Sequence, residues 1–266
     1  MPRLTRSPED RERLERFGPT YVEALARGLK VLQAFAQHRR ALPLSEIAAA
    51  VGLARASVRR TLHTLVHLGF AESDGRSFKL TPKVLRLAGA YLSSNAAADI
   101  LQPAVERLAQ QVQEACSAAV LDGGEVVMVA HASPNRVIAV AAQIGYRLPA
   151  LSSSLGRVLL AALDDAGLDA FLARSRPARL TRYTVTDKRA LKALILKARR
   201  DGFALVDQEA ELGFRSVAVP LRRRDGSVIA ALNIGAHSER VALKQLRDTL
   251  LPRLQATAAS LREQLI

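Results

Sequence analysis

The strongest pattern of apolar and polar positions lies in the stretch Leu44–Phe70, LSEIAAAVGLARASVRRTLHTLVHLGF. It predicts two helices joined by a tight turn. Ser45 is the expected cap of the first helix, and Gly52 follows its end, where glycine adopts a left-handed backbone at little cost. The second helix is predicted to run from about Ala54–Ala56 to Leu68. Its apolar residues recur at helical spacing and form a stripe for burial: Val58, Leu62, Leu65 and Val66.

The opposite face of this second helix is basic and neutral polar. It carries Arg55, Ser57, Arg59, Arg60, His63, Thr64 and His67. No acid occurs between Ile47 and Ala71. Such a pair of helices is either an ordinary helical hairpin with a solvated basic face or a helix-turn-helix whose second helix enters the DNA major groove.

The residues after the second helix favour DNA binding. Short strands are predicted at 70–72 and 78–80, and the intervening Asp74-Gly75 is a hairpin signal. A helix-turn-helix followed at once by a β-hairpin is a winged helix, whose wing would carry Arg76 and Lys79 toward phosphates. The expected DNA-contacting residues are Arg55, Ala56, Ser57, Arg59, Arg60 and Arg76.

The flanking segments divide the chain. Residues 1–18 form a densely charged tail, and an amphipathic helix at Tyr21–Ala36 should pack under the helix-turn-helix. Thr81-Pro82 begins a further helix, in which Val84–Leu92 is the expected connector. The predicted organisation is a tail (1–18), a winged helix-turn-helix (19–82), a linker helix (83–97) and a larger domain (98–266).

The larger domain changes from helical to strand-like periodicity after a helix at Ala98–Gln113. The expected strands are Ala118–Asp122, Val126–His131, Val137–Ala141, Phe203–Val206, Ser216–Leu221 and Val228–Gly235. The expected helices are Leu155–Leu163, Asp165–Ala173 with Asp164 as its cap, a helix from the Asp187 cap to Asp201, and Val241–Ile266. The loop Ile144–Ser152 precedes the first of them. The predicted fold class is therefore α+β, an antiparallel sheet with helices on its faces.

Charge and composition restrict the classes of partner that the sequence predicts. The 266 residues hold 39 Lys and Arg against 25 Asp and Glu, a net charge of +14. Residues 1–92 contribute 16 and 8 of these, so about a third of the chain carries more than half of the excess, which favours a polyanion partner there. The sequence contains neither a membrane-spanning apolar run nor a signal-peptide core, so a cytoplasmic protein is expected. The single cysteine, Cys116, is expected to be a buried thiol.

A serine-rich turn is the candidate ligand site of the larger domain. It comprises Ser152, Ser153, Ser154, Leu155, Gly156 and Arg157. Free N–H groups at a helix start, together with serine hydroxyls, can bind a carboxylate without a metal. Leu148 and Leu151 suit an apolar ring or chain, and Arg147 and Arg157 are candidates for a second carboxylate. The alternatives are helix capping by the serines and a surface position for Arg157.

Three acids alternate further along the chain: Asp207, Glu209 and Glu211. They form either a metal or acid–base cluster or, the favoured interpretation, a solvated loop that pairs with Arg215. His131 and His237 lack the spacing of metal ligands. No nucleophile motif such as G-x-S-x-G occurs. Neither a metal nor a cofactor is expected.

From about Tyr21 to Leu261 the chain resembles the IclR family of bacterial transcription regulators. The resemblance rests on LSEIAAAVGLARASVRRTLHTLVHLGF and FKLTPKVLRLA, and on RLPALSSSLGRVLLAAL, DGFALVDQEAELGFRSVAVPL and VIAALNIG. It is closest to the branch that controls protocatechuate, β-ketoadipate and p-hydroxybenzoate catabolism. That branch often has Cys-Thr-Ser in the loop where this chain has Leu151-Ser152-Ser153-Ser154.

The resemblance implies a winged helix joined by a linker helix to a GAF-like effector domain. It implies homodimers or dimers of dimers, double-stranded operator DNA as partner, and a small organic acid as effector, either an aromatic acid or a dicarboxylate. RNA polymerase is a further candidate partner of such a regulator. Motif positions place the effector against Ser153, Ser154, Leu155, Ser216 and Asn233, with Val206 or Asp207 in the region where the family often has an acid.

Three functions compete at this point. The favoured one is a ligand-responsive, sequence-specific DNA-binding regulator, which is not an enzyme. A constitutive DNA-binding protein would leave the large second domain without a role. A hydrolase using the serine-rich loop would lack a nearby histidine and would leave the basic helix unexplained.

Overall fold

The computed structural model describes residues 18, 20–37, 40–87, 89, 96–134 and 143–265. The chain divides into two compact units, Met1–Tyr91 and Leu92–Ile266, and each is described by itself. Several predicted features lie outside the described residues: nearly all of the charged tail, the strand Val137–Ala141 and much of the linker helix Val84–Leu92. The finer domain boundaries stay predictions.

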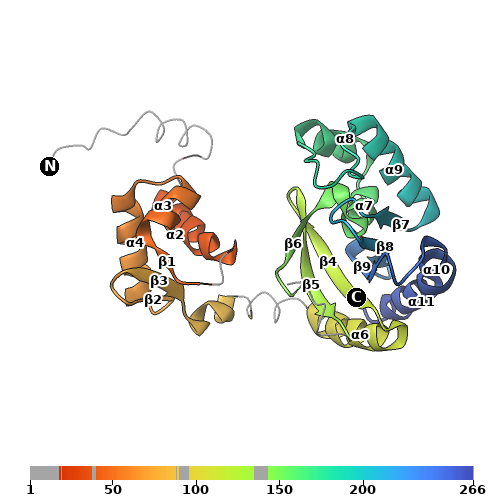
Figure 1. Cartoon of the computed structure of the whole chain (residues 1–266), viewed down its shortest axis with the longest axis horizontal. Helices are drawn as coiled ribbons and strands as arrows, with labels where there is room; N and C mark the ends of the chain where they lie inside the picture. Colours follow the sequence, from red (N-terminus) through yellow and green to blue (C-terminus); the bar gives the residue numbers. More distant parts are fainter. Residues whose placement is uncertain are drawn as a thin grey trace. The chain divides into compact units, whose positions relative to one another are not determined.

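The first unit is a winged helix-turn-helix, as predicted (Figure 1). Its helices are α2 (Glu23–Gln33), α3 (Leu44–Val51) and α4 (Arg55–His67), with short 3-10 turns at Ala34–Gln37 and Pro82–Val84. Its strands are β1 (Leu42–Pro43), β2 (Ala71–Ser73) and β3 (Ser77–Leu80), in the antiparallel order β1-β3-β2. Their common core is built from Val31, Phe35, Leu42, Ile47, Ala48, Val58, Leu62, Leu65 and Ala71.

The turn between α3 and α4 depends on one glycine. Gly52 adopts a left-handed conformation with φ of 64°, and its N–H closes the end of α3. The predicted cap at Ser45 is wrong, because α3 begins at Leu44 and Pro43 holds the cap position without a side-chain bond. Pro43 also pairs with Ser77 in the sheet. The strand thus runs directly into the helix and sets its start.

The second unit is built on a six-stranded antiparallel sheet in the order β6-β5-β4-β9-β8-β7. Its strands are β4 (Ala115–Asp122), β5 (Glu125–Ala132), β6 (Arg147–Pro149), β7 (Ala204–Asp207), β8 (Phe214–Arg222) and β9 (Val228–His237). The edge strand β6 lies where the sequence predicted only a loop. It is three residues long, too short for an alternating pattern to reveal it.

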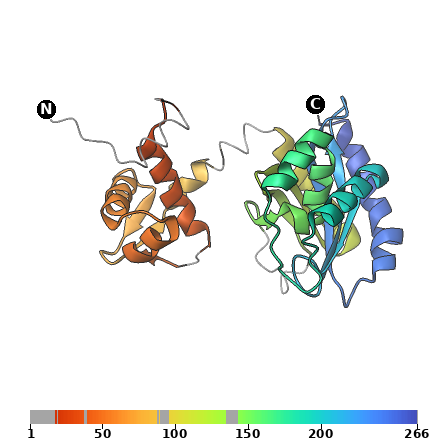
Figure 2. The ribbon, with the colours of Figure 1, turned by 90° about the horizontal axis from the view of Figure 1, so that it is seen from above.

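Helices cover both faces of this sheet. Figures 1 and 2 show α7, α8 and α9 on one side and α6, α10 and α11 on the other. Their bounds are α6 (Ala96–Val112), α7 (Ser154–Ala161), α8 (Asp165–Arg174), α9 (Lys188–Asp201), α10 (Leu243–Gln245) and α11 (Leu251–Arg262). Each layer has its own apolar core. The predicted α+β class is confirmed.

The sequence predicted one continuous closing helix, Val241–Ile266, but the structure shows an interrupted one. A π-helical turn, Leu246–Leu250, separates α10 from α11. The cause is Pro252, which has no N–H to donate to the preceding turn and whose ring crowds the carbonyl there. Two predictions about the same unit are confirmed: Asp164 and Asp187 cap α8 and α9, and Cys116 is fully buried.

Candidate functional site

The solvent-facing side of α4 carries a row of arginines. Arg55, Arg59 and Arg60 are exposed, and among the described residues none of them forms an ion pair. In the stripe opposite, Val58 and Leu62 are fully buried and Leu65 is 8% exposed. The prediction that Val66 is buried is wrong: it is 37% exposed, because its position on the helix lies at the edge of the stripe. Burial of that stripe therefore fixes which side chains α4 presents to solvent.

The start of α4 is also open. Its cap residue, Ala54, provides no side-chain bond, so the first-turn N–H groups are available to a phosphate. Ala56 is exposed there, while Ser57 is half-buried and its Oγ lies 3.4 Å from Arg27 Nη1.

The wing is a tight turn organised by Asp74. Its carboxylate accepts hydrogen bonds from the N–H groups of Ser77 at 2.7 Å and Arg76 at 2.8 Å. These bonds lower the pKa of Asp74 below its ordinary value of 3.8. Arg76 is exposed at the tip, whereas Lys79 pairs with Glu72 at 2.7 Å.

The second unit contains a cavity of about 290 Å³ between the sheet, the start of α7 and the loop after β7. Residues of the serine-rich turn, Ser152–Leu155, form one wall. The loop Ala210–Gly213 forms another. The apolar lining includes Met128, Tyr146, Leu148, Leu155 and Phe214.

The serine wall is held tightly in place. Ser153 caps α7, since its Oγ accepts the N–H of Gly156 at 3.0 Å. Gly156 is essential to this packing: a Cβ there would lie 2.1 Å from the carbonyl oxygen of Ala150. The hydroxyls of Ser154 and Ser216, both buried, lie 2.8 Å apart. The α7 start thus presents N–H and O–H groups from a rigid turn.

A polar row crosses the floor of the cavity. His131, Ser117 and Asn233 occupy paired positions on β5, β4 and β9, so their side chains share one face of the sheet. Ser117 Oγ lies 2.9 Å from His131 Nδ1. Burial lowers the pKa of His131 below its ordinary value of 6.5, which favours the neutral ring.

Asn233 is the unusual member of this row. It is 6% exposed, and its Oδ1 is buried with no hydrogen-bond partner among the described residues. A buried acceptor without a partner is costly, so an amide in this position is suited to a ligand that donates a hydrogen bond.

The arginine at the cavity is already paired with an acid. Glu114 and Arg240 lie 2.7 Å apart at its rim, and burial raises the pKa of Glu114 despite the nearby Arg240 cation. Arg240 is the sole arginine or lysine among the described lining residues. The cavity therefore has little free positive charge for a second carboxylate.

The structure brings six of the predicted effector residues together at this cavity: Ser152, Ser153, Ser154, Leu155, Ser216 and Asn233. Four others do not line it. Arg147 pairs with Asp122 and Glu125, Asp207 pairs with Arg215, and Gly156 packs on Ala150. Arg157 is buried and pairs with Glu209 at 2.7 Å.

The acidic residues at the end of β7 and in the loop after it have different surroundings. Asp207 pairs with Arg215 as predicted, at 2.9 Å. The expectation of a solvated loop is wrong for Glu209, which is 7% exposed. Periodicity could not reveal this, because the loop is ordered by partners far away in sequence.

Sequence reasoning missed Ser117, His131, Tyr146 and Phe214 as cavity residues. The available signal was a polar side chain at an inward position of an otherwise apolar strand, as in ACSAAV and VVMVAHA. Among the described residues no group of three or more His, Cys, Asp and Glu side chains could hold a metal ion. No described helix is long and apolar enough to cross a membrane.

A winged helix with a basic recognition face, followed by a separate unit with a largely apolar cavity that carries a row of neutral polar groups, defines a DNA-binding regulator with a small-molecule domain. Models of two families match the chain: the IclR helix-turn-helix domain over residues 24–75 and the bacterial transcriptional regulator IclR C-terminal domain over residues 89–263. The chain belongs to the IclR family of bacterial transcriptional regulators.

Two curated relatives are similar over nearly their whole length. The Pca regulon regulatory protein of Pseudomonas putida is 42% identical, over 99% of this chain and 91% of the relative. The p-hydroxybenzoate hydroxylase transcriptional activator of Acinetobacter baylyi is 36% identical, over 91% of each chain. The predicted resemblance to the aromatic-acid branch is confirmed.

Solved structures agree with the fold. A transcriptional regulator from Rhodococcus sp. RHA1 has a TM-score of 0.81 and 43% identity, covering 92% of this chain and 98% of that one. An IclR homologue from Microbacterium hydrocarbonoxydans, complexed with 4-hydroxybenzoate, has a TM-score of 0.77 and 28% identity, covering 91% and 98%.

Proposed function

We propose that the cavity of the second unit binds a hydroxybenzoate-type aromatic acid and that this binding changes the affinity of the first unit for operator DNA. The observation that carries the proposal is the buried, unpartnered Oδ1 of Asn233 on the cavity floor. The bound 4-hydroxybenzoate of the Microbacterium homologue supports the same ligand class.

The carboxylate belongs at the serine turn. The first-turn N–H groups of α7 and the hydroxyls of Ser152 and Ser154 offer neutral donors, which suit an anion at a helix start. Leu148 and Leu155 supply apolar surface for the ring. The ring hydroxyl then meets Asn233 and the Ser117–His131 pair, where it can both donate and accept.

This arrangement separates hydroxybenzoates from dicarboxylates. A second carboxylate would bring no donor to Asn233 Oδ1, and Arg240 is already paired with Glu114. Arg147, Arg157 and Asp207 have protein partners of their own, so they have no part in the proposed contacts.

Calorimetry on the full-length protein tests the proposal. An acceptor left unpaired in the complex costs about 1–3 kcal/mol, so 4-hydroxybenzoate should bind about 10-fold tighter than benzoate or better. Succinate should not bind. Asn233→Leu should abolish the preference for the hydroxyl while leaving benzoate binding in place. Equal affinities of the parent for 4-hydroxybenzoate and benzoate would contradict the proposal.

The carboxylate position has its own matched variants. Ser154 is the first residue of α7, where proline is tolerated, and Ser153 before it is extended, as a residue before proline prefers. Ser154→Pro removes one N–H and the hydroxyl, and Ser154→Ala removes the hydroxyl alone. The proline variant should bind 4-hydroxybenzoate more weakly than the alanine variant.

For the first unit we propose that α4 enters the major groove through Arg55, Ala56, Ser57, Arg59 and Arg60, with Arg76 of the wing on the DNA backbone.

One winged helix covers one half-site, which favours a homodimer or a dimer of dimers on a two-fold operator. The apolar residues Val22, Leu25 and Leu29 are 60%, 62% and 49% exposed at helical spacing, a face that self-association would cover. Sedimentation of the free protein should give at least a dimer.

A further inference from the structure

Arg157 and Glu209 form a buried ion pair beside the cavity without lining it. Arg157 lies on α7 and is 2% exposed, and Glu209 lies in the loop after β7. Arg157 Nη2 donates to Glu209 Oε2 at 2.7 Å, and Arg157 Nε donates to the Leu151 carbonyl at 3.0 Å. One guanidinium therefore holds both the turn before the serine wall and the loop that forms the facing wall.

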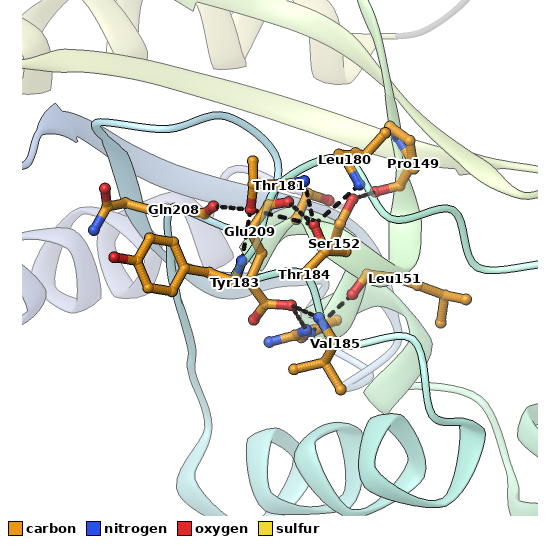
Figure 3. A network of polar contacts seen from close by, with 12 residues as sticks. Pro149, Leu151, Ser152, Leu180, Thr181, Tyr183, Thr184, Val185, Gln208 and Glu209 are labelled. Atoms are coloured by element: carbon orange, nitrogen blue, oxygen red, sulfur yellow. Dashed lines mark hydrogen bonds and ion pairs between the residues drawn. The ribbon is translucent and has the colours of Figure 1, made fainter.

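The carboxylate of Glu209 also binds a third segment of the chain. Its Oε2 also accepts the N–H of Val185 at 3.0 Å. The segment 180–185 is tied to the same loop by two threonines: Thr184 Oγ1 donates to the Glu209 carbonyl at 2.7 Å, and Thr181 Oγ1 donates to the Gln208 carbonyl at 2.6 Å. Figure 3 shows Thr181, Thr184 and Val185 turned toward Gln208 and Glu209.

The loop that these bonds hold has an uncommon backbone. Gln208 adopts a left-handed φ of 57°, and its side-chain Oε1 accepts the N–H of Gly213 at 3.1 Å. Between these residues lie Ala210, Glu211 and Leu212, which line the cavity. A non-glycine residue in this conformation persists only where its surroundings hold it.

We propose that Arg157 and Glu209 are positioning residues that set the distance between the two walls of the cavity, through the Leu151 carbonyl on one side and the Gln208–Gly213 loop on the other. The inference rests on the proposed function of the cavity as the effector site. It assigns to Arg157 a role different from effector contact, and it gives Glu209 and the Leu180–Val185 segment a role in ligand affinity.

A variant that tests this role must not leave one buried charge without its partner, because an unpaired buried charge destabilises the fold by itself. Arg157→Met with Glu209→Gln removes both charges, keeps the side-chain length at 209 and leaves a shorter, unbranched apolar side chain at 157. The glutamine retains an oxygen for the Val185 N–H, while the Leu151 carbonyl loses its partner. Arg157→Lys is the conservative variant, since it keeps the charge but lacks the rigid planar donor geometry of the guanidinium.

The matched control is the neighbouring pair Asp207 and Arg215. It lies on the strands that flank the same loop, but its side chains lie on the sheet face opposite Val206 and Ser216, which line the cavity. Asp207→Asn with Arg215→Met removes the two charges there in the same way.

Hydrogen exchange of the ligand-free protein is the first measurement. The Arg157→Met/Glu209→Gln variant should exchange the amides of residues 151–155 and 209–213 about 10-fold faster or more, while the core strand β9 keeps the parent rate. The control variant should leave both segments unchanged. Unchanged exchange in the double variant overturns the inference, whatever the ligand does.

Calorimetry with 4-hydroxybenzoate is the second measurement. The double variant should bind at least 10-fold more weakly than the parent, Arg157→Lys should fall between them, and the control should equal the parent. Faster exchange with unchanged affinity also overturns the inference. If the parent itself does not bind 4-hydroxybenzoate or benzoate, the proposed ligand class fails, and the exchange result still decides whether the pair positions the two walls.

Discussion

The recognition helix α4 and the cavity of the second unit handle polar side chains in opposite ways. On α4 the arginines are exposed and, within the described part of the chain, unpaired. At the serine wall of the cavity the polar groups are neutral, buried and held by neighbours, as with Ser153 on Gly156 and Ser154 on Ser216. The charged residues nearby, Arg157 and Glu209, are paired with each other.

This difference follows from the ligand that each site is suited to. Duplex DNA is a large polyanion, and exposed cations displace its counterions without any need for burial. A small acid must be enclosed to be distinguished, and enclosure makes every unpaired polar group costly. Substitutions on α4 should therefore change binding alone, whereas substitutions around the cavity should also change stability.

The largest expected effect is at Gly156. Gly156→Ala would bring a Cβ to 2.1 Å from the Ala150 backbone oxygen, which cannot move without displacing the serine wall. The free energy of unfolding of the second unit should fall by about 3 kcal/mol or more. Gly124→Ala is the control, because a Cβ there meets nothing within 4 Å. Thermal melts of the two variants check this, and a near-parental melt for Gly156→Ala would contradict the described packing.

An intermediate effect is expected on α4. Arg59→Ala or Arg60→Ala should weaken operator binding by about 1–3 kcal/mol if the side chain contacts a base, with no change in melting temperature or in 4-hydroxybenzoate affinity. Arg223→Ala, an exposed arginine of the second unit, should leave operator binding unchanged. Titration of a labelled operator at fixed salt measures all three. Parental affinity of both α4 variants would remove α4 as the recognition face.

The smallest effect is a pH dependence from His131. Burial holds its pKa in the folded protein below the ordinary value of 6.5, so the unfolded chain binds more protons between the two values. The free energy of unfolding should therefore decrease as the pH falls through about 6.5. His131→Asn should lose this slope, which denaturant melts between pH 5 and 8 can detect as a difference from the parent. Parallel curves for the two proteins would show that His131 titrates as in the unfolded chain.

Local signals predicted the first unit well. The apolar stripe of α4, Gly52 after α3 and Asp74-Gly75 in the wing each depend on a few consecutive residues. The caps of α8 and α9 belong to the same class. The errors arose where distant partners decide: β1 pairing with β3 set the start of α3, and the short β6 exists because β5 offers it an edge.

The sequence by itself determined the class of protein: its winged helix, its basic recognition face and the serine-rich helix start follow from periodicity, charge and spacing over short stretches. Only the tertiary structure decided which polar residues face the cavity. Arg157 and Glu209 lie 52 positions apart in the sequence. Ser117 and Asn233 lie on different strands, β4 and β9. Only the tertiary fold brings the members of each pair together. The physical reason is that a side chain's burial and partners depend on the other elements packed around it, which local periodicity does not specify.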